Sequence, residues 1–326
     1  MAGKSVLRKV WRQRTGRLGL SIVIAGANEG HCSADLENIA LIYKYIFMEK
    51  ILLAIDAINI DANTLDFACN IAQLTHSQLT GIFLENTQER TRFAGTHVYS
   101  DGFSGTLLTA TGPDMEELAN RCDDNIRVFK ETCNKKNVRY LVHRDRGIPI
   151  NEIIRESRFA DLMILDAKTS FVMQDEAAPT GFAKKVLMGA ECPVIVAPER
   201  FTSIGEIVFT YDGSASSVFA IKQFTHLFPQ LDEKAATLLY INEGDRQAIE
   251  DRRDIANWLS VHFSVINIVS LDGDLKTTLF EYLDSKMFTI VVMGAYGRSA
   301  ISQFFKRSSA DTVIQALDLP VFIAHR

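Results

Sequence analysis

The feature that most constrains this chain is an internal repeat, in which two stretches carry the same succession of apolar runs. Lys50–Asp56 (KILLAID) and Glu206–Asp212 (EIVFTYD) are both short apolar runs that end in Asp. A helix-compatible segment follows each of them, Asn63–Leu74 in the first copy and Ser217–Leu227 in the second. Four further apolar runs then match in order: Leu79–Leu84 with Ala236–Ile241, Val138–His143 with Val265–Ser270, Leu162–Leu165 with Ile290–Met293, and Val194–Ala197 with Val321–Ala324.

Apolar runs without polar alternation, separated by helical segments, are typical of parallel strands covered by helices on both faces. We therefore predict an α/β fold of two tandem, open, parallel five-stranded sheets flanked by helices, of the Rossmann-like type. A chain of 326 residues, 47% of them hydrophobic, is long enough for two such cores. The predicted division is an extension over 1–47, a first domain over 48–200 and a second over 201–326.

The first 47 residues differ in charge from the rest of the chain. They hold seven Lys and Arg against three Asp and Glu, whereas the whole chain has a net charge of −5. Met48 opens directly into the first predicted strand, so we expect the extension to be disordered or foreign to the native protein. Secretory-signal and basic-tail interpretations of it stay open.

Composition excludes several classes of function. A net charge of −5 does not suit a surface that neutralises nucleic-acid phosphates. No apolar run reaches the ~18 to 20 residues that a membrane span requires. Five scattered cysteines, without a CxxC pair, fit free thiols in a reducing compartment. We expect a soluble, cytoplasmic protein that binds no nucleic acid.

One motif stands where open parallel sheets bind ligands, at the carboxyl end of a strand. Gly294-Ala295-Tyr296-Gly297 follows the fourth strand of the second copy, and nine residues later Arg307-Ser308-Ser309 opens a predicted helix. This stretch resembles the universal stress protein family, whose nucleotide-binding members carry Gly, two residues, Gly, nine residues, then Gly and Ser or Thr. Gly294, Gly297 and Ser308 follow that pattern, whereas Arg307 departs from it.

The resemblance covers about residues 48–326 and implies an adenine-nucleotide site in the second half. Glycines and a helix N-terminus let backbone N–H groups reach phosphate oxygens, and similar proteins place an Asp such as Asp212 beside the nucleotide. Arg307 either fills the phosphate pocket or holds the phosphates. The expected ligand is ATP or a related adenine nucleotide, with Mg²⁺ or without it. A site that binds no nucleotide is the alternative. The nucleotide-binding residues expected are Asp212, Gly213, Ser214, Ile241, Gly294, Gly297, Arg298, Arg307, Ser308 and Ser309.

Each part of this motif also has a purely structural interpretation. Gly294 and Gly297 suit a strand-to-loop turn, Ser308 with Asp311 forms a capping box, and Asp212 suits an Asx turn. In the first copy Asp166 and Thr169 stand where Gly294 and Gly297 stand in the second. A carboxylate there would repel phosphate, so we expect the first domain to lack the phosphate loop.

The leading hypothesis is a universal stress protein that senses an adenine nucleotide and regulates a protein partner not identified by the sequence. The alternatives are a nucleotide-free scaffold with a degenerate pocket and a weak ATPase. We expect no dedicated catalysis, no catalytic residue and no metal site, because the seven histidines show no paired spacing. The Asn86–Pro113 loop is expected to be disordered or to act as a lid or partner contact. Domains of this family pair through their last strand, which allows internal pairing or a homodimer.

Overall fold

The computed structural model describes residues 48–86, 115–172, 176–242, 252–294 and 318–324. The predicted extension over 1–47 and nearly all of the Asn86–Pro113 loop lie outside the described residues. The described residues, which begin at Met48, belong to one compact unit. The proposed boundary at residue 200 falls between two strands of that unit and stays a prediction.

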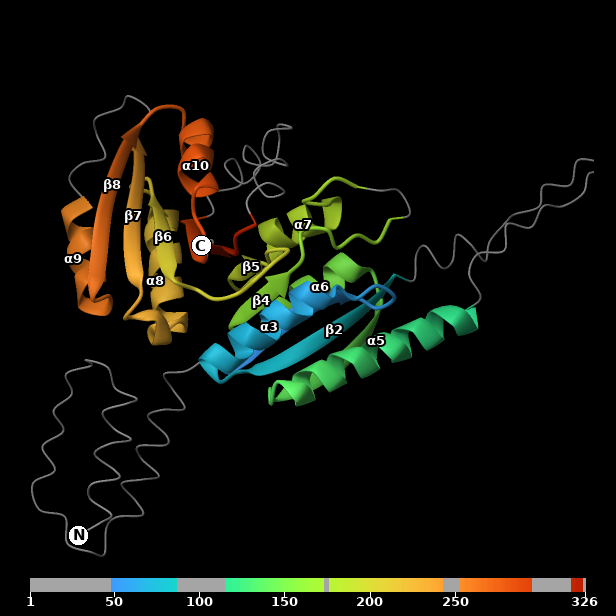
Figure 1. The fold of residues 1–326 in the computed structure, drawn as a ribbon. Coiled ribbons are helices and arrows are strands. Elements are labelled where there is room, and N and C mark those ends of the chain that lie inside the picture. The colour runs from blue at the N-terminus through green and yellow to red at the C-terminus, as the bar shows by residue number, and fades with distance from the viewer. Residues whose placement is uncertain (1–47, 87–114, 173–175, 243–251, 295–317, 325–326) are drawn as a thin grey trace, which may run out of the picture. The chain divides into compact units, whose positions relative to one another are not determined.

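Within its described residues, the first copy of the predicted repeat contains five strands and four helices, coloured blue to yellow-green in Figure 1. The third strand starts two residues later and ends four residues later than Val138–His143, because its C-terminal end is half-buried and polar and does not appear as an apolar run. The elements in chain order are β1 (Lys50–Asp56), α3 (Ala62–Thr75), β2 (Gln78–Asn86), α5 (Met115–Lys135), β3 (Tyr140–Gly147), α6 (Pro149–Ser157), β4 (Leu162–Leu165), α7 (Gly181–Gly189) and β5 (Val194–Val196).

The second copy repeats this order, coloured yellow to red in Figure 1. Its elements are β6 (Glu206–Tyr211), α8 (Ala215–Leu227), a short 3-10 helix (Pro229–Leu231), β7 (Ala235–Asn242), α9 (Arg252–His262), β8 (Val265–Asp272), α10 (Leu275–Asp284), β9 (Thr289–Gly294) and β10 (Val321–Ala324).

The repeat extends to individual hydrogen bonds. The Met163 N–H donates to the carbonyl oxygen of Pro193, and the Val291 N–H donates to the carbonyl oxygen of Pro320. Each of these prolines directly precedes the last strand of its copy. Asp61, Ser214 and Asp274 each begin a helix by accepting a backbone N–H.

The ten strands in the described part of the chain form a single sheet in the order β3-β2-β1-β4-β5-β10-β9-β6-β7-β8. The strands of each copy pair in parallel, as the buried apolar runs predicted, so the α/β fold class is confirmed. The two predicted five-stranded sheets are joined at their last strands. There β10 pairs antiparallel with β5, with Phe322 opposite Ile195.

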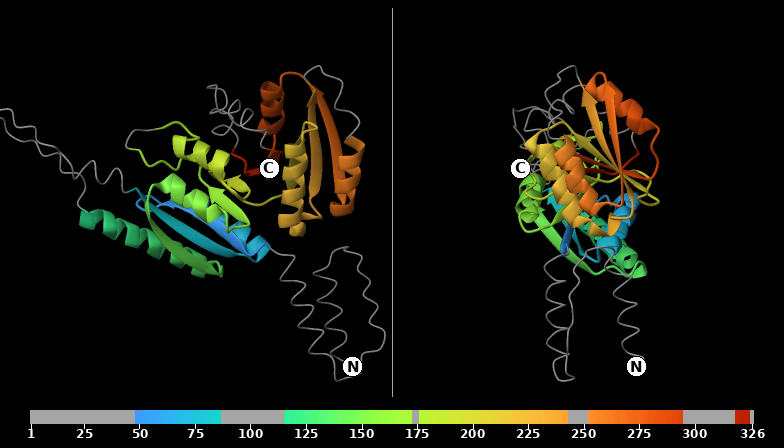
Figure 2. Two further views of the ribbon diagram at one scale, coloured as in Figure 1. Left: turned by 180° about the vertical axis from the view of Figure 1, so that it is seen from behind. Right: turned by 90° about the vertical axis from the view of Figure 1, so that its left-hand side faces the viewer.

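Strand alternation divides the core into layers on the two faces of the sheet. Ile51, Leu53 and Ile55 of β1 face α3 and α5, in a core that continues across the junction to Phe209 and the helices α8 and α9. The opposite face carries two separate cores, one under α6 and α7 and the other under α10. Figure 2 shows α8 and α10 on opposite faces of the second half of the sheet.

Two expectations from the sequence concern the state of the cysteines and the lack of a membrane span. The four cysteines in the described part, Cys69, Cys122, Cys133 and Cys192, are buried free thiols. Among the described residues, no helix has both the length and the apolar character that crossing a membrane would require.

Candidate nucleotide site

The described part of the predicted site lies at the carboxyl ends of β6, β7 and β9, three neighbouring strands. Asp212 directly follows β6, and its Oδ1 accepts the Ser214 N–H at 2.9 Å, which is the predicted Asx turn. The other carboxylate oxygen, Oδ2, is buried and has no hydrogen-bond partner among the described residues. A buried acceptor without a donor is costly, so this oxygen is available to a ligand that brings an N–H or O–H group.

The turn after Asp212 leads into the N-terminus of α8. Gly213 has a φ of 81°, in the left-handed region where a side chain would be strained. Ser214 is the N-cap residue, and its Oγ accepts the Ser217 N–H at 3.1 Å. The helix dipole favours negative charge beside this end of α8.

Gly294 ends β9 and is in very close contact with the same end of α8. A Cβ added at Gly294 would lie 2.4 Å from the backbone nitrogen of Ser217, closer than any side chain permits. The glycine is therefore required by strand-to-helix packing, and the turn-forming role that the sequence suggested is not its main constraint.

Ile241 and Asn242 end β7, the strand next to β6. The Asn242 side-chain amide donates to Asp272 Oδ1 at 3.1 Å, and its Oδ1 is buried with no hydrogen-bond partner in the described part of the chain. Sequence reasoning singled out Ile241 but missed this amide. The structure thus brings two buried acceptors without donors, on Asp212 and Asn242, to one edge of the sheet.

The remaining predicted site residues all fall within 295–317. Gly297, Arg298, Arg307, Ser308 and Ser309 lie outside the described residues. The phosphate-binding half of the predicted site therefore stays a prediction. Both roles suggested for Arg307, filling the phosphate pocket or holding the phosphates, stay predictions as well.

The first copy has a different set of contacts at the equivalent place. Asp56 matches Asp212, and its Oδ1 accepts the Ile58 N–H at 3.1 Å. Burial raises the pKa of the Asp56 carboxyl to about 6, against the lowering effects of the Ile58 N–H and the Arg121 charge. Asp166 matches Gly294, and its Oδ1 accepts the Lys168 N–H at 2.9 Å. Burial and the nearby Asp61 raise the pKa of Asp166.

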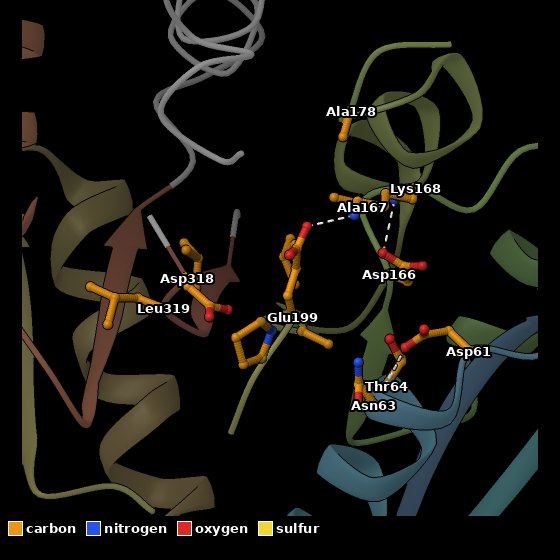
Figure 3. Close-up of a pocket in the computed structure, with 14 residues that line it drawn as sticks. Asp61, Asn63, Thr64, Asp166, Ala167, Lys168, Ala178, Glu199, Asp318 and Leu319 are labelled. Atoms are coloured by element: carbon orange, nitrogen blue, oxygen red, sulfur yellow. Dashed lines mark hydrogen bonds and ion pairs between the residues drawn. The ribbon is translucent and has the colours of Figure 1, made fainter. Parts of the chain in front are cut away.

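A pocket of about 130 Å³ is lined by residues of both halves, at a place where the sequence predicted no ligand site. It opens between the start of α3, the residues after β4 and β5, and the start of β10, and Figure 3 shows its labelled side chains. Four of the lining residues are acidic: Asp61, Asp166, Glu199 and Asp318. Lys168 Nζ bonds Glu199 at 2.5 Å, and Arg200 Nε bonds Asp318 at 2.9 Å. A pocket with this excess of carboxylates is unsuited to phosphate groups.

A second polar group that the sequence did not reveal lies on β3 and α6. Ligand atoms of His143, Asp145 and Glu156 lie within 4.8 Å of one another. The His-x-Asp alternation along the predicted third strand was a weak signal for it. Glu156 could not be assigned to it without the packing of α6.

Comparisons with known proteins agree with this fold. No family model matches the chain. A curated universal stress protein of Synechocystis sp. is 26% identical over 141 residues, 42% of this chain and 48% of that protein, so the match spans about half the length of this relative. A universal stress protein structure from Archaeoglobus fulgidus superposes with a TM-score of 0.62 at 13% identity, covering 86% of this chain and 98% of that one.

A Pseudomonas aeruginosa structure assigned to the universal stress proteins gives a TM-score of 0.51 at 16% identity, covering 85% of this chain and 93% of that one. At these identities the structural matches establish the fold, and the Synechocystis match adds a relationship in sequence. In sequence over 141 residues, and in fold over most of its length, this chain is therefore similar to universal stress proteins.

Proposed function

We propose that the chain binds an adenine nucleotide at the carboxyl ends of β6, β7 and β9, and that it acts in the stress response as a nucleotide-responsive regulator of a protein partner. One observation carries the proposal: Asp212 keeps a buried carboxylate oxygen with no donor among the described residues. The edge of the sheet where Asp212 lies is the ligand-binding edge of open α/β folds.

The chemistry of this edge suits a nucleoside. Ribose hydroxyls and the adenine amino group are donors, and they match the unpaired acceptors Asp212 Oδ2 and Asn242 Oδ1. The N-terminus of α8 adds a favourable dipole for negative charge. In this proposal Gly213, Ser214 and Ile241 shape the nucleoside end of the site, and Gly294 sets the distance between β9 and α8.

The phosphate end of the proposal rests on the sequence motif alone. Gly297, Arg298, Ser308 and Ser309 would supply backbone and hydroxyl donors, and Arg307 would supply a cation for the phosphates, with Mg²⁺ as the accompanying ion. We propose that the bound nucleotide regulates the protein: ATP shifts the arrangement of the domains, and the partner recognises that arrangement.

Calorimetric titration of MgATP into the full chain tests the proposal. We expect binding that Asp212→Asn weakens at least tenfold, since a hydrogen bond to a charged group contributes ~1.5 to 3 kcal/mol. The substitution keeps an acceptor for the Ser214 N–H and turns the second oxygen into a donor. Gly294→Asp is a poor test, because any side chain there collides with α8.

The chain supplies its own control for this titration. Asp56→Asn makes the same change at the matching position of the first copy, and we expect it to leave MgATP affinity unchanged. No binding to a folded wild-type chain would refute the proposal and favour the scaffold. ATP turnover lost in Asp212→Asn and retained in Asp56→Asn would favour the weak ATPase instead.

A further inference from the structure

We infer that His143, Asp145 and Glu156 form a divalent transition-metal site, with zinc as the preferred ion, in the first copy of the repeat. His143 and Asp145 are two residues apart on β3, so they project from the same face of this edge strand. The helix α6 covers that face and contributes Glu156 near its C-terminal end. The site needs no residue of the proposed nucleotide pocket.

The three side chains lie close to one another, but the two carboxylates face different nitrogens of the His143 ring, so a shared ion requires a side-chain rotation. Nε2 of His143 lies 3.4 Å from Asp145 Oδ1, and Nδ1 of the same ring lies 3.7 Å from Glu156 Oε2. Around a zinc ion, with metal–ligand distances of ~2.1 Å, ligand atoms lie roughly 3 to 3.5 Å apart. One ligand atom from each residue lies within 4.8 Å of the other two, so side-chain rotation closes the remaining gap.

Burial and charge give a second reason for a cation here. The side chain of Asp145 is 12% exposed, and its Oδ2 is buried without a hydrogen-bond partner among the described residues. The neighbouring cations lie at long distances from the two proposed carboxylate ligands, Asp145 and Glu156. Arg155 Nη2 lies 3.9 Å from Asp145 but 2.5 Å from Glu152, and Lys50 Nζ lies 3.7 Å from Glu156.

The charges of the cluster favour a divalent ion. Three carboxylates, those of Asp145, Glu152 and Glu156, face the two cations of Lys50 and Arg155. The cluster therefore keeps one negative charge while His143 is neutral. A metal ion needs the neutral imidazole as ligand, and an imidazole among carboxylates favours zinc, whereas magnesium prefers a shell of oxygens and water.

The exposure of the site allows an ion to enter. The side chain of His143 is 44% exposed and that of Glu156 is 16% exposed. Three protein ligands leave at least one coordination position for water. The geometry thus describes a surface-accessible site with one open position.

Calorimetric titration of ZnCl₂ into the full, untagged, EDTA-stripped chain tests the inference. We expect one zinc ion per chain at this site, and at least a tenfold loss of affinity in Asp145→Asn and in His143→Gln, since loss of metal-site groups typically costs 10- to 100-fold. Asp254→Asn, on an exposed surface of α9, is the matched control and should bind zinc as the wild type does.

A thermal unfolding series with and without zinc supplies a second measurement. Zinc should raise the Tm of the wild type and of Asp254→Asn and leave that of Asp145→Asn unchanged. Zinc binding that survives in both ligand variants, or a wild-type chain that takes up no zinc, overturns the inference. A magnesium titration should show no matching heat, and equal affinity for both ions would also overturn it.

Discussion

At the scale of single residues, Asp56 and Asp212 occupy matching positions in the two halves but differ in the groups that surround their carboxylates. Each accepts the backbone N–H two residues ahead of it, and for Asp212 the sequence suggested this contact as an Asx turn. The sequence could not show that Asp212 keeps an oxygen without a donor, because that depends on which side chains pack above the sheet. Nor could it show that burial raises the pKa of Asp56 to about 6.

The raised pKa of Asp56 predicts a pH-dependent stability difference. Since the folded state binds this proton more tightly than the unfolded chain, the contribution of Asp56 to stability is largest at acidic pH and falls as the pH rises towards 6. Asp56→Asn should therefore increase the free energy of unfolding at pH 7 by ~2 to 3 kcal/mol. Urea unfolding of both proteins at pH 7 and pH 4.5 checks this, and an equal difference at the two pH values would contradict it.

The strands were predictable at the scale of elements because central parallel strands are buried on both faces and appear as unbroken apolar runs. The edge strand β3 was misplaced by a few residues, since most of it is only half-buried and its polar end carries His143 and Asp145. The glycine in β9 was recognised from a motif, but its contact with α8 arises from the packing of two elements 77 positions apart in the sequence (Ser217 and Gly294).

Two glycine substitutions test how closely the elements approach one another. Gly294→Ala would place Cβ 2.4 Å from the α8 backbone, whereas Gly189→Ala would meet only the flexible end of the Ile154 side chain at 2.7 Å. We expect the first to lower the free energy of unfolding by ~2 kcal/mol or more and the second by less than ~1 kcal/mol. Chemical denaturation measures both, and similar losses would show that α8 shifts easily.

At the scale of the whole molecule, the apolar runs predicted the strands of both halves, and the family resemblance implied pairing through the last strands, within the chain or between two chains. The structure has β5 paired with β10 within the chain. Which strands meet depends on shape and burial at the sheet edge rather than on any local pattern. The junction pairs Phe322 with Ile195, and both side chains are fully buried in a core that includes residues of both copies.

This continuous core predicts that the two halves unfold together. Phe322→Ala should lower the free energy of unfolding by ~3 to 5 kcal/mol, and the wild type should show one cooperative transition. Far-ultraviolet circular dichroism and tryptophan fluorescence, with Trp258 in the second half, should give coincident curves. Two separate transitions in the wild type would show that the copies are energetically independent.

The antiparallel pairing of β5 with β10 joins two halves whose sequences can change independently. Two identical subunits that met through this edge would share every substitution, so a site lost in one would be lost in both. Here the two partners are parts of a single polypeptide, and Asp166 stands in one where Gly294 stands in the other. In the proposed function, the half that binds the nucleotide is thus permanently linked, in a fixed one-to-one ratio, to a half that has no need to bind it.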